Sequence, residues 1–112
     1  MMVQSVVLPA TVKVGYRTYR IEIWDTLEAM GANRYGECSH TARCIRVDVR
    51  HGPVQAAQTL LHEILHAVWT IQTLKDDDGE ERAVSAVSNG LTAVWIDNPG
   101  LLEWFSSHVT AE

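Results

Sequence analysis

The sequence predicts an α+β domain in which a small, mostly antiparallel sheet from the N-terminal half packs against helices from the C-terminal half. One observation is a change in composition: residues 3–50 are rich in Val, Ile, Tyr, Thr and Arg, whereas residues 54–107 are rich in Ala, Leu, Val and Glu. Branched and aromatic side chains favour strands, and unbranched ones favour helices. A second observation is length, because 112 residues suffice for one compact domain and not for two. Residues 1–112 are therefore expected to form a single domain.

Short extended segments are predicted in the first half. Residues 5–8 and 11–14 lie on either side of Pro9, and Gly15 then permits a turn. Residues 18–24 alternate apolar with polar side chains, which is typical of a half-buried strand. The residues of this strand expected to face the core are Tyr19, Ile21 and Ile23.

A short helix and a hairpin are predicted next. Residues 25–33 favour a helical turn that ends at Gly31. Residues 35–39 and 43–49 are two extended segments separated by a turn at residues 40–42. In the second segment Ile45, Val47 and Val49 alternate with Arg46, Asp48 and Arg50, so the first set is expected to face the core and the second to face solvent.

Three helices are predicted in the second half. The first covers residues 54–73 and follows Pro53, whose missing N–H is not needed at a helix start. The second covers residues 80–96 and is stopped by the Pro-Gly pair at residues 99–100, and a short third helix covers residues 101–107. Apolar residues recur at helical spacing in the first two. They are Leu60, Leu61, Ile64, Leu65, Val68 and Ile71 in one, and Val84, Val87, Leu91, Val94 and Trp95 in the other.

Composition and charge exclude several classes of partner. The chain has 14 acidic against 9 basic residues and no basic run, so no nucleic-acid partner is expected. No apolar run is long enough for a membrane span, and the N-terminus does not have the pattern of a secretory signal, so a cytoplasmic protein is expected. Cys38 and Cys44 are then expected to stay reduced, and their spacing does not match a structural zinc site.

The sequence LLHEILHAVW, at residues 60–69, carries the chemistry. His62 and His66 are four residues apart, so on a helix they lie on the same face and both imidazoles can bind one zinc ion. Glu63 lies about 100° around the helix. It is therefore placed to take a proton from a water whose pKa zinc lowers to roughly 7, rather than to bind the metal.

Catalytic zinc needs a third protein ligand, and the acidic residues after the helix offer it. Glu80 and Glu81 begin the next helix, and helical periodicity slightly favours Glu80, so both remain candidates from the pattern alone. The run Asp76–Asp78 is expected to be a solvated turn, because it lacks the ligand pattern of a calcium loop.

Other polar and aromatic residues are assigned smaller roles. Tyr35 is a candidate contact for the substrate or for the oxyanion of a tetrahedral intermediate. Three other histidines are expected at the surface, where any of them is an alternative to Tyr35; they are His40, His51 and His108. The tryptophans expected in the core are Trp69, Trp95 and Trp104.

With these residues in view, the chain resembles small zinc metallopeptidases of the gluzincin type, in particular short phage-encoded metallopeptidase-domain proteins and ImmA/IrrE-like proteins. The likeness covers Tyr35 to Trp104, and its specific part is the helix with His62, Glu63 and His66. Two weaker stretches support it: residues 35–38 with 44–48 resemble the strands that precede that helix, and residues 81–95 resemble a helix that bears a glutamate ligand.

The resemblance implies a zincin-like fold with zinc between two helices. It implies that Glu81, three residues before the apolar Val84, is the third ligand in preference to Glu80. It implies a peptide or protein substrate bound along the exposed edge of the hairpin at residues 35–49. It also implies a phage or bacterial cytoplasmic origin. The chain departs from the pattern at Ser85, where asparagine is common, and it has no helix-turn-helix domain.

The leading hypothesis is a zinc-dependent peptidase with Glu63 as general base. Two alternatives remain open. One is a zinc-binding domain that cleaves weakly or not at all and acts through protein contacts, because a chain of this size has little room for a deep cleft. The other is a helical interaction module without metal.

Overall fold

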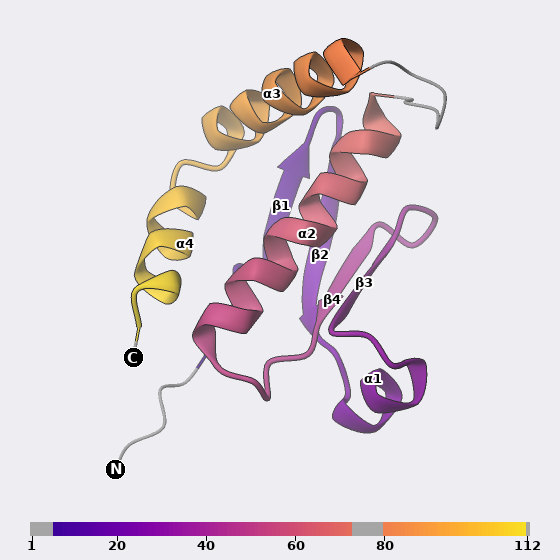
Figure 1. Cartoon of the computed structure of the whole chain (residues 1–112), viewed down its shortest axis with the longest axis vertical. Coiled ribbons are helices and arrows are strands. Elements are labelled where there is room, and N and C mark those ends of the chain that lie inside the picture. The colour runs from indigo at the N-terminus through magenta and orange to yellow at the C-terminus, as the bar shows by residue number, and fades with distance from the viewer. Residues whose placement is uncertain (1–5, 73–79, 112) are drawn as a thin grey trace.

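Figure 1 shows the fold as a computed structural model, which describes residues 6–72 and 80–111 and, within residues 80–89, only the side chains of residues 83, 86 and 87. Four strands form one sheet in the order β1-β2-β4-β3, and helix α2 lies across one face of it. The α+β prediction is confirmed. The strands are β1 (Thr11–Val14), β2 (Arg17–Ile23), β3 (Gly36–Ser39) and β4 (Cys44–Val47). The helices are α1 (Thr26–Ala32), α2 (Pro53–Ile71), α3 (Glu80–Asp97) and α4 (Leu101–Val109).

The sheet is mixed, with one parallel pairing that the sequence pattern did not indicate. β1 pairs with β2 and β3 pairs with β4 in antiparallel register, whereas β2 pairs with β4 in parallel, with Ile21 opposite Ile45. The chain leaves β2 through α1 and returns as the β3–β4 hairpin, whose second strand has the direction of β2. As a consequence β3 forms an edge of the sheet.

The core lies between the sheet and α2. Alternate strand residues meet the apolar stripe of α2, and α3 and α4 each add a buried side chain at one side of α2. The buried strand residues are Val12, Val14, Tyr19, Ile21, Ile45 and Val47, and those of the helices are Ala56, Leu60, Ile64, Ala67, Val68, Val94 and Leu101. Burial of this apolar set is the main stabilising contribution to the fold.

The end of β2 does not follow the predicted alternation. Ile23, expected to face the core, is 61% exposed, and Trp24 is 4% exposed. The strand ends at Ile23, and the backbone N–H of Trp24 donates to Val47 O at 2.8 Å. The alternation holds only while the chain stays extended, so the turn toward α1 moves the indole inward instead.

Helix α1 passes through Gly31 and ends beyond it, contrary to prediction. The Asp25 side chain accepts hydrogen bonds from the N–H groups of Leu27 and Glu28 at the start. At the other end Asn33 adopts φ 56° and ψ 44°, and its N–H donates to the last turn. Asparagine tolerates this left-handed conformation, so it replaces glycine as the terminating residue.

Asp48 and Trp69 also lie where the pattern did not place them. Asp48 was expected in solvent but is buried. Its Oδ1 accepts from the Arg50 N–H at 3.1 Å, and its Oδ2 forms a 2.9 Å ion pair with Arg50 Nε without a hydrogen bond. Trp69 was expected in the core but is 36% exposed. Trp95 and Trp104 do pack against the core, and Trp104 Nε1 donates to the Val7 carbonyl oxygen.

The predicted acidic turn and the predicted lack of a membrane span can be compared with the structure only in part. The solvated turn, with Asp76–Asp78, lies outside the described residues. Among residues 6–72 and 80–111, none of the helices combines the length and apolar character that crossing a bilayer requires.

The packing of α3 on α2 predicts an unusual response to alanine. A Cβ at Gly90 would lie 2.4 Å from Val68 Cγ1, which is buried and rotamerically stiff. We expect Gly90→Ala to lower the free energy of unfolding by about 1–3 kcal/mol, although alanine favours helix by about 1 kcal/mol. At Gly31 in α1 a Cβ meets no atom within 4 Å, so Gly31→Ala should be neutral or add about 0.5–1 kcal/mol. Urea denaturation of both variants measures this; equal effects of the two would contradict the close contact.

Candidate functional site

Two histidines project from the exposed side of α2. His62 Nε2 and His66 Nε2 are 3.1 Å apart, and the rings meet edge to face with centroids 4.7 Å apart. Both rings are exposed, whereas the opposite face of the helix is buried in the core. The four-residue spacing on a helix thus brings two nitrogen atoms to one point in solvent, as the sequence predicted.

The separation of these nitrogens fits a shared metal ion. Two imidazole ligands at about 2.0–2.1 Å from a tetrahedral zinc lie roughly 3.3 Å apart. Without an ion the 3.1 Å contact is a hydrogen bond in which one ring donates and the other accepts. The rings therefore already hold nearly the spacing that two zinc ligands need.

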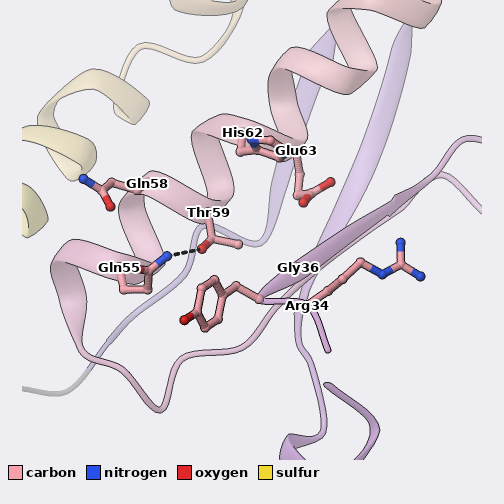
Figure 2. A pocket seen from close by; sticks show the side chains of 8 residues that line it. Arg34, Gly36, Gln55, Gln58, Thr59, His62 and Glu63 are labelled. Carbon is pink, nitrogen blue, oxygen red and sulfur yellow. Dashed lines mark hydrogen bonds between the residues drawn. The ribbon is translucent and has the colours of Figure 1, made fainter. Parts of the chain in front are cut away.

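Glu63 projects from α2 toward β3, about 100° around the helix from His62, and lines one groove with both histidines. Its side chain is only 6% exposed, and Figure 2 shows it directed from α2 to the strand near Gly36. A Cβ at Gly36 would lie 2.5 Å from Thr59 Cγ2 and 3.2 Å from Glu63 Oε2. Glycine is therefore what allows the strand to approach the helix and cover the carboxylate.

Burial controls the electrostatics of Glu63. Desolvation raises the pKa of its carboxyl, while His62, His66 and Arg34 lower it by smaller amounts. The net direction is upward, so the carboxyl holds a proton more tightly than a solvated glutamate does.

Two grooves flank Glu63 along β3. The one in Figure 2 has a volume of about 300 Å³, and the Gln55 amide donates to Thr59 Oγ1 at 3.2 Å on its α2 wall. Its lining residues are Arg34, Tyr35, Gly36, Gln55, Gln58, Thr59, His62 and Glu63. The second has a volume of about 240 Å³ and is lined by Arg34, Gly36, Glu37, Cys38, His40, His62, Glu63 and His66. His62 and Glu63 thus line both grooves, and His66 lines the second.

The third predicted ligand lies outside the described side chains. The backbone of Glu80 and Glu81 begins α3, but neither side chain is described, so either residue as a zinc ligand stays a prediction. Among the described residues no three His, Cys, Asp or Glu side chains gather at one point. The structure therefore brings together His62 and His66 of the predicted ligands.

The other candidate substrate contacts, Tyr35 and three histidines, differ in whether they line a groove beside Glu63. Tyr35 is 51% exposed and lines the groove of Figure 2 with His62 and Glu63. His51 packs edge-on against Tyr35, with ring centroids 5.1 Å apart, and lines neither of the two grooves. His108 is stacked on Trp104 in α4. Of the alternatives to Tyr35, only His40 joins the groove that contains His66.

The sequence pattern did not single out His40 or Arg34. His40, expected at the surface as one of the alternatives to Tyr35, is half-buried and hydrogen-bonded to Tyr19 and Thr70. Arg34 lines both grooves beside Glu63. No local pattern marks either residue, because their contacts come from strands and a helix that are distant in sequence.

The two cysteines are free thiols. Burial, followed by the nearby Glu63, raises the pKa of Cys38 to about 12. The Cys38 thiol therefore keeps its proton at neutral pH.

Comparison of the chain with protein-family models, with curated proteins and with solved structures gives no match. Function is therefore inferred from the site.

The raised pKa of Glu63 predicts how stability depends on pH in the metal-free protein. The folded state binds the proton of Glu63 more tightly than the unfolded state, so this group stabilises the fold fully below its unfolded pKa of 4.5. That contribution is lost as pH rises through the folded pKa. We expect Glu63→Gln to be more stable than wild type at pH 7, and the difference to vanish near pH 4. Urea titrations with a chelator present at both pH values test this; a variant less stable at pH 7 than wild type would oppose it.

Proposed function

We propose that the chain is a zinc-dependent metallopeptidase. The observation that carries the proposal is the convergence of His62 Nε2 and His66 Nε2, 3.1 Å apart, beside a desolvated glutamate that is next in sequence to His62. Two exposed imidazoles four residues apart have no evident structural use, because neither ring fills the core. Together with Glu63 they supply two metal ligands and a proton acceptor.

The proposed zinc site uses His62, His66 and Glu81, with α3 supplying the last of these. Bound Zn²⁺ would supply a Lewis acid that acidifies a water ligand and polarises the scissile carbonyl. The zincin-like arrangement, with zinc between α2 and α3, belongs to this proposal. It is supported by the packing of α3 against α2.

Glu63 acts as the general base and then as the acid. Its carboxylate takes a proton from the attacking water, and it returns that proton to the amine that leaves when the peptide C–N bond breaks. A carboxyl with a raised pKa suits both steps near neutral pH, because it holds the proton between them more readily than a solvated glutamate would.

Strand β3 is the proposed docking edge for the peptide. The Asp48 N–H donates to Tyr35 O, so alternation in the β3–β4 pair points the backbone groups of Gly36 and Cys38 to the open edge. These two residues also line the groove that contains His62, Glu63 and His66. An extended peptide added to β3 would thus pass the site, with Tyr35 in contact at one end.

The proposal predicts that a substitution of Glu63 abolishes peptide cleavage without loss of zinc binding. Glu63→Gln should retain zinc at wild-type stoichiometry and lose cleavage by at least about 100-fold, because the general base is removed while both histidines remain. Zinc is measured by elemental analysis, and cleavage by mass spectrometry of a peptide library. Glu103→Gln on exposed α4 is the matched control and should change neither. Equal cleavage by Glu63→Gln and wild type would exclude the mechanism.

A second prediction concerns the third ligand. Glu81→Gln should weaken zinc binding by about 10–100-fold or more, whereas Glu80→Gln should leave it within a few-fold. Titration with zinc against a competing chelator measures both. The reverse order would assign Glu80. Zinc retained without cleavage of any peptide would favour the non-cleaving zinc domain, and absence of zinc would favour the interaction module.

A further inference from the structure

His40 stands in the turn between β3 and β4, so it and Tyr35 flank opposite ends of β3. His40 lines the second of the two grooves. It shares that groove with His62, Glu63 and His66. Its imidazole Nε2 lies 2.8 Å from Thr70 Oγ1, and Thr70 follows His66 by one helical spacing of four residues on α2. The ring therefore lies over the same face of α2 as the histidine pair, one turn further on.

Both ring nitrogens of His40 and its backbone carbonyl have hydrogen-bond partners. Nδ1 lies 3.0 Å from the hydroxyl of Tyr19, a side chain that is fully buried in the core. The Tyr19 ring also meets the imidazole edge to face, with centroids 6.1 Å apart. Arg17 Nη1 donates to the His40 carbonyl oxygen at 3.2 Å. A core residue thus fixes the orientation of an imidazole at the groove.

These partners select one tautomer. The Tyr19 hydroxyl also has a hydrogen bond with the Arg17 side chain, which can only donate, so the phenol oxygen accepts from Arg17 and its O–H is left to donate to Nδ1. Burial, then the charges of Arg17 and His66, lower the pKa of His40, so its ring is neutral at pH 7. With Nδ1 accepting, Nε2 carries the hydrogen and donates to Thr70 Oγ1. The groove therefore has a fixed N–H donor beyond His66.

We infer that His40 contacts the substrate, its Nε2–H donating to the carbonyl oxygen of the scissile peptide bond as that oxygen gains negative charge. The inference rests on the proposed peptidase function. The peptide oxygen takes the place of Thr70 Oγ1 as acceptor, and the proton stays on Nε2, so His40 forms no covalent bond. Tyr19 is a positioning residue that acts through His40. A preorganised donor of this kind contributes about 10²–10³-fold to the rate.

The test compares variants of the full-length zinc-loaded protein on one library peptide that wild type cleaves. His40→Phe keeps the ring shape and removes both nitrogens, and it should lower kcat by about 100-fold, with KM and zinc content within a few-fold. Tyr19→Phe keeps His40 and should lower kcat by a smaller factor. His108→Gln, whose ring lines neither groove, should change nothing. Circular dichroism checks that each variant is folded.

A second readout does not depend on activity. Two-bond ¹H–¹⁵N NMR of the metal-free protein at pH 7.5 should show His40 as the Nε2–H tautomer, and Tyr19→Phe should shift the ring toward a mixture. An Nδ1–H tautomer in wild type, or kcat within three-fold of wild type for folded His40→Phe, would overturn the role of His40 alone. Zinc-loaded wild type that cleaves no peptide would overturn the proposed function, and this inference with it.

Discussion

The contact between the start of β3 and helix α2 is the constraint on which the site depends. At Gly36 the strand backbone lies so near the helix that a single Cβ would meet Thr59 Cγ2 at 2.5 Å. This approach covers Glu63, places the edge strand β3 beside the histidine pair, and leaves grooves on either side of the carboxylate. A larger side chain at this position would separate strand from helix and expose Glu63 to water, so its pKa and its position relative to the edge would change together.

The polar groups of the molecule differ in how their burial is compensated. Asp48 is buried but pairs with Arg50, and Tyr19 is buried but its hydroxyl meets His40. Such partners offset most of the desolvation cost of a buried polar group. At Glu63 the compensation is incomplete, because desolvation is the largest influence on the pKa of its carboxyl and its neighbours reverse it only in part. A carboxyl held at this cost to stability is typical of a functional site rather than of a structural one.

The elements with local signals were predictable. The strand patterns at residues 11–14 and 18–23, and the long helix after Pro53, follow from periodicity that depends only on near neighbours. The sequence-based predictions were wrong or incomplete where the chain changes direction. The inward position of Trp24 follows from the end of β2, and the parallel pairing of β2 with β4 follows from the path through α1. Periodicity within one segment carries no information on such turns.

The sequence by itself determined that His62 and His66 share a face of a helix and that Glu63 points elsewhere, because helical spacing is set by backbone hydrogen bonds between residues four apart. Only the tertiary structure decided that Glu63 is buried against Gly36 and that His40 joins the groove, held by Tyr19 and Thr70. Those contacts join residues 21 to 30 positions apart or on different elements. They exist only after the strands have paired and β3 has packed on α2, so they depend on tertiary contacts rather than on any local pattern.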